Sequence, residues 1–197
     1  MTEEKNKEPE KKNKIVMVTG CSSGFGIKIS ARLASKGYQV ISTLRNLYRQ
    51  DELLNAVKER GGEVTVMPLD VNALYTIDDC ISQIRHKFGR IDVLVNNAGY
   101  GIGGFFEDLT DEEIRRQMDT NFFGVQNVTR RVLPLMREQK EGKIINISSV
   151  SGFSSQPAFS AYSASKWALE AFSESLHYEV EPFGIKVLLI EPGTYKT

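Results

Sequence analysis

Six short apolar runs alternate with segments of helical pattern along this chain of 197 residues. The runs are rich in β-branched residues, as buried strands are. Helical segments between such strands imply right-handed crossovers that join parallel strands. No repeat or linker interrupts the alternation, so it predicts a single α/β domain. The predicted strands cover residues 15–18, 39–43, 64–68, 92–95, 143–147 and 186–190.

A glycine-rich turn follows the first predicted strand. It reads Gly20-Cys-Ser-Ser-Gly24-Phe-Gly26 and leads into a predicted helix over residues 27–36, which Gly37 ends. Glycines let the backbone turn tightly and approach a pyrophosphate, whose charge is stabilised at a helix N-terminus. The spacing differs from the G-x-G-x-x-G of many dinucleotide sites, and a turn of this kind also occurs without any ligand.

The end of the second predicted strand indicates which nucleotide such a turn would hold. Sites for NAD place a carboxylate there to bind the ribose 2′-hydroxyl, whereas sites for NADP place a cation there for the 2′-phosphate. This strand is followed by Arg45 and Asn46, with no carboxylate. A guanidinium matches the geometry of a phosphate, so the sequence favours NADP(H). The alternative is that Arg45 is a solvated loop charge.

A tyrosine and a lysine four residues apart form a second pattern. Residues at this spacing lie on the same face of a helix, so Tyr162 and Lys166 would point into one cleft. An ammonium close to a tyrosine favours the phenolate, which can exchange a proton with an alcohol or a developing alkoxide. Such a pair also recurs by chance in helices, so it gains weight only from the motifs around it.

Several motifs occur in one order along the chain, and in them the sequence resembles the short-chain dehydrogenase/reductase family. The resemblance runs from about Lys14 to the last residue and implies a doubly wound, Rossmann-type parallel sheet of strand order 3-2-1-4-5-6. It implies an NADP-binding catalytic domain over residues 14–197, preceded by a polar tail over residues 1–13 that we expect to be disordered. The motifs are Thr19-Gly-x-x-x-Gly-x-Gly26, Asn96-Asn-Ala-Gly99, Asn121, Ser149, Tyr162-x-x-x-Lys166 and Pro192-Gly193.

Four of these residues are catalytic in what the resemblance implies, which is hydride transfer between a nicotinamide cofactor and a carbonyl or alcohol. Tyr162 would exchange the proton, and Ser149 would hydrogen-bond the substrate oxygen. Lys166 would hold the nicotinamide ribose and stabilise the phenolate. Asn121, in a helix predicted over residues 111–138 where asparagine is disfavoured, would help a water connect the lysine to solvent.

The resemblance also implies a set of cofactor contacts. Asp70 and Val71 would meet the adenine ring, although an aspartate after a strand is on sequence alone usually a helix cap. The motif at residues 96–99 would lie along the cofactor, although it also fits an ordinary turn. The last residue would meet the nicotinamide carboxamide. The implied cofactor-binding residues are Gly20, Ser22, Ser23, Gly24, Phe25, Gly26, Arg45, Asp70, Val71, Asn97, Ala98, Gly99, Tyr162, Lys166, Pro192, Gly193, Thr194 and Thr197.

The chain ends where members of this family usually continue. We expect it to lack the family's seventh strand and substrate lid, which would leave the sixth strand as an apolar sheet edge. A fragment of an ordinary reductase is favoured over a protein that works without a lid. The rival function is a catalytically idle NADP-binding or scaffold protein, and the epimerase or dehydratase branch of related folds fits the motifs less well.

Apolar residues near the motifs favour a largely apolar carbonyl or alcohol substrate, and the alternative is that they only pack in a core or a lid. These residues are Phe105, Phe106, Phe153, Pro157 and Phe159. Small residues recur along the helix of Tyr162 and would permit close packing in a homodimer or against a helix of the same chain. They are Ala161, Ala164, Ser165, Ala168, Ala171 and Ser175.

Composition excludes other classes. Twenty-five Lys and Arg balance 25 Asp and Glu without a basic stripe, so nucleic acid is not an expected partner. No apolar run is long enough to span a bilayer, so we expect a soluble, cytoplasmic protein.

Cys21 and Cys80 do not make a disulfide framework. Cys21 is either a thiol of lowered pKa at a helix start or simply a small residue in a tight loop. His86 and His177 have no ligand spacing and are expected on helix surfaces, so no metal site is predicted.

Overall fold

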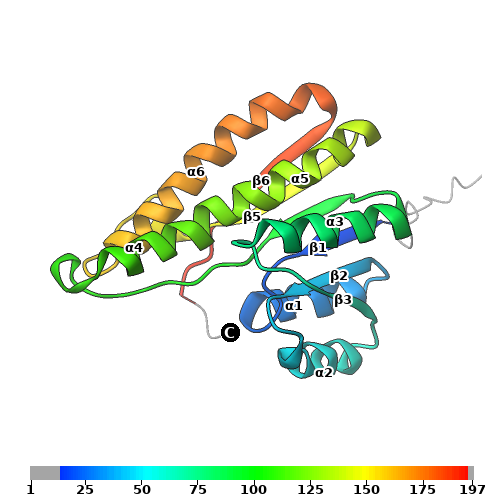
Figure 1. Cartoon of the computed structure of the whole chain (residues 1–197), viewed down its shortest axis with the longest axis horizontal. Helices are drawn as coiled ribbons and strands as arrows, with labels where there is room; N and C mark the ends of the chain where they lie inside the picture. The colour runs from blue at the N-terminus through cyan, green and yellow to red at the C-terminus, as the bar shows by residue number, and fades with distance from the viewer. Residues whose placement is uncertain (1–13, 195–197) are drawn as a thin grey trace, which may run out of the picture.

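The structure, a computed structural model, describes residues 14–194 as a six-stranded sheet between two layers of helices (Figure 1). The sheet order is β3-β2-β1-β4-β5-β6, and every neighbouring pair is parallel. The predicted strands and their order are therefore confirmed. The strands are β1 (Ile15–Val18), β2 (Gln39–Leu44), β3 (Val64–Pro68), β4 (Val93–Asn96), β5 (Gly142–Ile147) and β6 (Ile185–Ile190).

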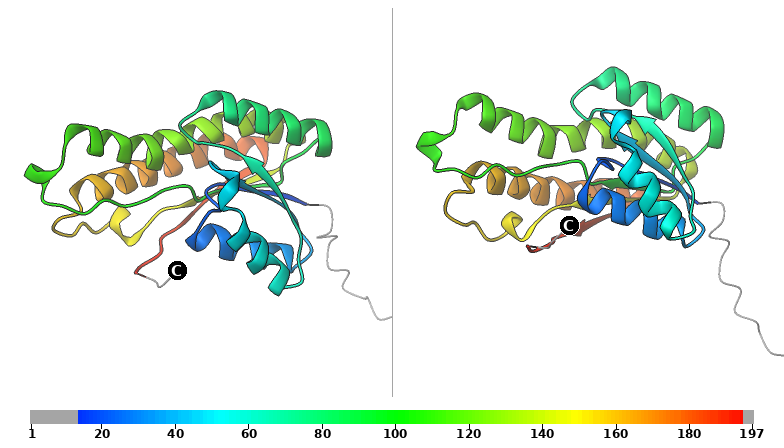
Figure 2. Two further views of the ribbon diagram at one scale, coloured as in Figure 1. Left: turned by 60° about the horizontal axis from the view of Figure 1, so that its bottom comes forward. Right: turned by 90° about the horizontal axis from the view of Figure 1, so that it is seen from below.

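The helices cover the two faces of the sheet unequally. Helices α1 (Gly24–Ala34) and α2 (Asp51–Glu59) pack on one face of β1 and β2. Helices α3 (Leu74–Phe88), α5 (Gly124–Gln139) and α6 (Ser160–Val180) pack on the other face. Figure 2 shows α1 and α2 on the side opposite the longer helices. The larger buried cluster thus lies under α3, α5 and α6.

Helix α1 begins at Gly24, three residues before the predicted start, so that prediction was wrong. Gly24 and Gly26, expected in the turn, lie in the first turn of the helix. The sequence did not predict a helix start at Gly24 because glycines are poor helix formers in a helix interior. Ser23 is the extended N-cap residue.

A π-helical turn interrupts the single helix predicted over residues 111–138. Helix α4 (Asp111–Met118) passes into π turn η4 (Asp119–Phe123) and then into α5, and Asn121 is buried in the π turn. Single π turns inside α-helices are frequent at functional sites.

The sheet edge at β6 is apolar and partly open. Ile185 is buried, whereas Leu188 and Ile190 are 44% and 47% exposed. No strand pairs with the outer edge of β6 among the described residues. Within residues 14–194, no helix combines the length and the apolar character needed to cross a membrane. The predicted polar tail at residues 1–13 and the predicted contact at Thr197 lie outside the described residues.

Candidate active site

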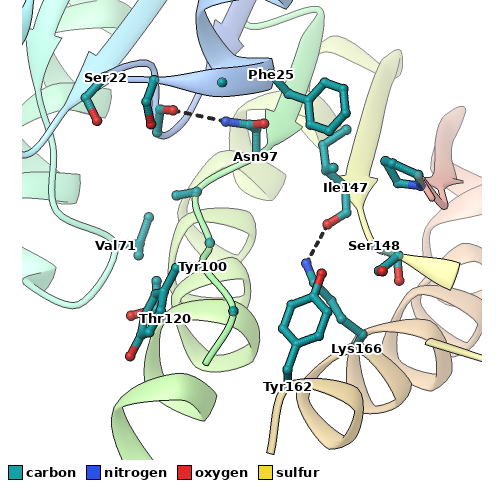
Figure 3. A pocket seen from close by; sticks show the side chains of 18 of the residues that line it. Ser22, Phe25, Val71, Asn97, Tyr100, Thr120, Ile147, Ser148, Tyr162 and Lys166 are labelled. Atoms are coloured by element: carbon teal, nitrogen blue, oxygen red, sulfur yellow. Dashed lines mark hydrogen bonds between the residues drawn. The ribbon is translucent and has the colours of Figure 1, made fainter. Parts of the chain in front are cut away.

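A pocket of about 570 Å³ opens at the carboxyl ends of the strands (Figure 3). Parallel strands bring these ends to one edge of a sheet, where open α/β folds bind ligands. Of the predicted site residues that the structure describes, all line this pocket except Gly26 and Asn121, which lie behind its wall. The pocket therefore gathers residues from the start, middle and end of the chain.

The glycine-rich turn is packed directly against the segment that follows β4. A Cβ on Gly20, whose φ is +72°, would lie 2.7 Å from the Cα of Ala98, and one on Gly26 would lie 2.3 Å from the carbonyl oxygen of Gly20. The side chain of Asn97 donates to the carbonyl oxygen of Gly20 at 3.0 Å (Figure 3) and to that of Thr19 at 2.9 Å. The hydroxyl oxygen of Thr19 accepts from the backbone N–H groups of Asn97 and Ala98. These bonds hold the two cofactor motifs together across the β1–β4 pair.

The chemistry of this wall fits a dinucleotide. The N-terminus of α1 meets the pocket, and its dipole favours an anion there. Ser23 makes no side-chain cap bond. Glycine positions without room for a Cβ bring bare backbone to the surface of the pocket, as close contact with a pyrophosphate requires.

Two arginines line the pocket at the end of β2. Arg45 was predicted, and Arg49 was missed. Among residues 14–194 neither guanidinium forms an ion pair with a carboxylate. Arg49 ends the short turn η2 (Leu47–Arg49), which the side chain of Asn46 caps by accepting from the N–H of Tyr48. Arg49 is four residues after Arg45, a spacing that brings two side chains together only in a helical turn, and the sequence did not predict such a turn there.

Asp70 and Val71, after β3, line the same pocket. Oδ1 of Asp70 accepts from the backbone N–H of Asn72 at 3.0 Å, so the aspartate shapes the turn that follows β3. It is not the N-cap of α3, which is Ala73. The helix-cap alternative for this residue was therefore wrong.

Tyr162 and Lys166 project from α6 into the pocket, as their spacing predicts. Nζ of Lys166 donates to the carbonyl oxygen of Ile147 at 2.8 Å and lies 5.8 Å from the centroid of the Tyr162 ring. Lys166 is only 6% exposed. Burial lowers the pKa of Lys166 to about 8, and the negative charge of Glu170 raises it in part.

Ser148 and Ser149 follow β5, and both line the pocket. Ser149 is 7% exposed, and its Oγ accepts from the backbone N–H of Ser151 at 3.1 Å. The hydroxyl hydrogen of Ser149 is thereby left available to an acceptor in the pocket. Hydroxyl, phenol and ammonium groups thus surround one end of the pocket.

Asn121 hydrogen-bonds both the loop after β4 and helix α6. Its Nδ2 donates to the carbonyl oxygen of Tyr100 at 2.8 Å and to the hydroxyl of Ser165 at 3.1 Å, while its Oδ1 accepts from the N–H of Tyr100. Both amide hydrogens are therefore engaged. The contacts tie the loop after β4 to α6, and the predicted role of Asn121 in proton transfer stays a prediction.

Gln117 makes the same kind of contact one turn earlier and was missed. Its side chain accepts from the N–H of Ile102 at 2.8 Å and donates to the carbonyl oxygen of Tyr100 at 2.7 Å. The residue is fully buried. Its spacing from Asn121 placed both on one helix face, but nothing in the sequence indicated that this face meets the loop after β4.

The aromatic residues predicted near a substrate are exposed. Phe105, Phe106, Phe153 and Phe159 are 66%, 71%, 56% and 39% exposed, so the alternative that they pack in the core is wrong. None of them lines the pocket itself. Phe159 packs edge-on against Tyr162, with ring centroids 6.3 Å apart.

The rim loops that carry these rings meet through one backbone bond. The N–H of Gly104 donates to the carbonyl oxygen of Ala158 at 2.8 Å. Ala158 has a φ of +62°, which is rare for a residue with a side chain. We use the name rim loops for residues 101–109 and 153–159.

Burial raises the pKa of the Cys21 thiol to about 11, so the alternative of a lowered thiol pKa is wrong. His86 is exposed, whereas His177 is half-buried rather than on the helix surface. The described residues include no group of three His, Cys, Asp or Glu placed to hold a metal ion. On α6, Ala164, Ala171 and Ser175 are exposed, and the homodimer stays a prediction.

Comparisons with known proteins agree with this geometry. The family model for short chain dehydrogenases matches residues 14–197. The chain is 45% identical over 183 residues to a 3-ketodihydrosphingosine reductase of Bacteroides thetaiotaomicron, covering 93% of this chain and 64% of the relative. It is 41% identical over 186 residues to human retinol dehydrogenase 8, covering 92% and 59%. The chain thus spans less than two thirds of the length of these relatives.

Solved structures give the same picture. A short-chain dehydrogenase from Streptomyces avermitilis matches with a TM-score of 0.85 and 44% identity, over 93% of this chain and 67% of that one. A metagenomic short-chain oxidoreductase in complex with NADP matches at 0.86 and 31% identity, over 93% and 84%. An NAD⁺-bound xylitol dehydrogenase matches at 0.88 and 29% identity, over 93% and 71%. The neighbours therefore include both nicotinamide cofactors.

A parallel sheet in the order 3-2-1-4-5-6, a glycine-rich turn locked to the segment after the fourth strand, and a family model that matches from residue 14 onward lead to one conclusion: this chain belongs to the short-chain dehydrogenase family.

Proposed function

We propose that this chain carries the cofactor-binding and catalytic part of an oxidoreductase that transfers hydride between NADP(H) and a largely apolar carbonyl or alcohol. The observation that carries the proposal is the convergence of Tyr162, Lys166 and Ser149 in a pocket whose other wall fits a dinucleotide. The relatives named for a ketodihydrosphingosine and a retinol support an apolar substrate. The exposed aromatic rings of the rim loops support it as well.

The cofactor preference rests on two arginines. Arg45 and Arg49 line the pocket at the end of β2, where a 2′-phosphate would need cations. Guanidinium groups bind phosphate oxygens in pairs of parallel hydrogen bonds. The absence of a carboxylate partner for either arginine within the described residues supports NADP(H) over NAD(H).

The chain's own groups have distinct tasks in this proposal. A nicotinamide supplies the hydride donor or acceptor when it is bound. Tyr162 holds or releases the proton at its phenolic oxygen, and Ser149 donates a hydrogen bond to the same substrate oxygen. Lys166, whose Nζ lies 5.8 Å from the centroid of the Tyr162 ring, stabilises the phenolate and is fixed by its bond to Ile147. Each donor that is preorganised in this way contributes about 3 kcal/mol to lowering a barrier.

Oxidation of NADPH against a panel of ketones and aldehydes tests the proposal. We expect wild-type turnover in a chain extended to the length of its relatives, and a loss of about 100-fold or more in Tyr162→Phe, because the ring stays and only the proton-transferring oxygen is removed. Tyr178→Phe, an exposed tyrosine on the same helix, is the matched control.

A folded wild type that binds NADPH and reduces nothing in the panel would favour the idle, cofactor-binding alternative. Equal losses in both tyrosine variants would count against Tyr162 as the proton donor. The proposed homodimer through the small-residue face of α6 is tested separately, by light scattering.

A further inference from the structure

Glu170 lies one helical turn beyond Lys166 on α6, on the side away from Tyr162. Residues at i and i+4 are neighbours on one helix face, so Tyr162, Lys166 and Glu170 form a row. The site described above uses the first two members of this row. Glu170 lines a separate hollow of about 530 Å³ between α6 and β6.

The carboxylate of Glu170 reaches toward the turn that carries Ser148. A Cβ on Gly152 would lie 2.8 Å from Oε1 of Glu170 and 2.9 Å from Oγ of Ser148, so both oxygens converge on the same point of turn η5 (Val150–Gly152). Both oxygens are buried, and neither has a hydrogen-bond partner at standard geometry within residues 14–194. Gly152 leaves the space in which this approach occurs.

Burying polar oxygens without partners is costly, so such a pair needs a reason. Lys166, one turn away, is also buried, and its ammonium donates a hydrogen bond to the neutral carbonyl of Ile147. An ammonium that is removed from water and bonded to a neutral acceptor tends to lose its proton. A carboxylate one turn away opposes that loss.

We propose that Glu170 is a positioning residue of the active site: it supplies the negative charge that keeps Lys166 in its ammonium form, and Ser148 holds its carboxylate toward the site. The proposal rests on the proposed function, because the ammonium matters through Tyr162. Glu170 touches neither the pocket nor the reacting atoms, so it acts through Lys166 alone.

The charges around the pair act in both directions. Burial lowers the pKa of Lys166, and the carboxylate of Glu170 raises it in part. Burial raises the pKa of Glu170 above its ordinary value and Glu191, just after β6, adds to that rise, whereas Ser148 and Lys166 lower it. Glu174 and His177 line the hollow farther along α6.

The test follows the lysine directly. Lysine labelled with ¹³C at Cε is titrated by NMR in the full chain with no cofactor, and the Lys166 signal is assigned with Lys166→Met. In Glu170→Gln, which keeps the shape and an acceptor for Ser148, the Lys166 transition is expected to move to lower pH than in wild type. Glu170→Asp is expected to restore it in part, and Ser148→Ala to move it less than Glu170→Gln does.

Glu174→Gln is the matched control. It removes the same charge from the same helix, but about 12 Å along the axis from Lys166 instead of about 6 Å, and it is exposed to solvent. It is expected to leave the transition in place. In the extended enzyme, the pH profile of kcat is expected to shift to lower pH on its alkaline side in Glu170→Gln only.

An unmoved Lys166 transition in a folded Glu170→Gln, or equal shifts in Glu170→Gln and Glu174→Gln, would overturn the proposal. Should Glu170→Gln fail to fold, Ser148→Ala still decides it, since an unmoved Lys166 transition in that variant would also overturn the proposal. The NMR arm needs no substrate. A shifted transition without any turnover would therefore defeat the proposed function and leave the charge relation between Glu170 and Lys166 standing.

Discussion

At the scale of the residue, the burial of the Lys166 ammonium lowers the stability of the folded chain. The folded protein holds it at 6% exposure with a pKa near 8, against 10.5 in its ordinary state. Between these values the unfolded chain binds more protons than the folded one, so the free energy of unfolding rises as the pH rises from about 8 to about 10.5. Below pH 8 the full penalty of burying the ammonium is present.

Lys166→Met should reveal this penalty. The variant removes the buried charge, so its free energy of unfolding at pH 7 should exceed that of wild type by up to about 3 kcal/mol. The excess should shrink by pH 10, measured by urea denaturation. The lost hydrogen bond to Ile147 lowers the variant equally at both pH values. A difference that stays constant with pH would contradict the prediction.

The two arginines near β2 should act on one phosphate. Replacing Arg45 and Arg49 together by alanine should weaken NADPH binding by about 10- to 100-fold, because bonds to a charged group are worth about 1.5 to 3 kcal/mol. NADH binding should change little, and fluorescence titration compares the two. Arg60→Ala, on an exposed residue after α2, is the control. Equal weakening for both cofactors would remove the arginines from a 2′-phosphate site.

At the scale of the element, the π turn η4 and the last turn of α4 hold the loop after β4. Gln117 and Asn121 replace the hydrogen bonds that a neighbouring strand would give to Tyr100 and Ile102. The loop forms one wall of the pocket. It also packs against Tyr162, since a Cβ on Gly101 would lie 3.3 Å from that ring. A loop without regular structure is thereby fixed by two amide side chains.

Gln117→Leu should loosen this loop. Tyr100 keeps its bond from Asn121, but the N–H of Ile102 loses its acceptor, which costs about 1 to 3 kcal/mol when the group is buried. Hydrogen exchange should become faster over residues 99–104, and urea denaturation should show the loss. Arg116→Gln, on the exposed neighbour, is the control. Unchanged exchange in Gln117→Leu would show that the loop does not depend on this side chain.

The elements differ in how far the sequence predicts them. Strands β1 to β6 follow from their β-branched runs because buried parallel strands need apolar residues on both faces. The start of α1 was misplaced because Gly24 and Gly26 suit a turn as well as a helix start. Arg49 and Gln117 could not be found because their roles arise from contacts between distant segments. Ser149, Tyr162 and Lys166 were found through motif spacing and family resemblance, and their roles stay predictions.

At the scale of the whole molecule, the described sheet ends in an apolar strand. Leu188 and Ile190 are 44% and 47% exposed, and the buried cluster under α1 and α2 extends to β4 and β5 but includes no residue of β6. An exposed apolar edge strand pairs readily with other chains. The segment shared with this chain covers 64% and 59% of the relatives named above.

The 197-residue chain should therefore self-associate through β6. Leu188→Lys combined with Ile190→Thr should lower the association measured by light scattering across a concentration series, because a charge on an edge strand opposes pairing. Leu54→Lys, on a similarly exposed leucine of α2, should have no such effect. Association that is equal in all three proteins would place the contact elsewhere.

The rim loops have one more consequence. Phe105, Phe106 and Phe153 are more than half exposed, and the two loops meet through the backbone bond between Gly104 and Ala158. Substitutions of Phe105, Phe106 and Phe153 remove little buried area, whereas Phe159 packs against Tyr162. Under the proposed function, the exposed part of the rim can therefore change in sequence at almost constant stability, and substrate preference can change with it while Tyr162 and Lys166 stay in place.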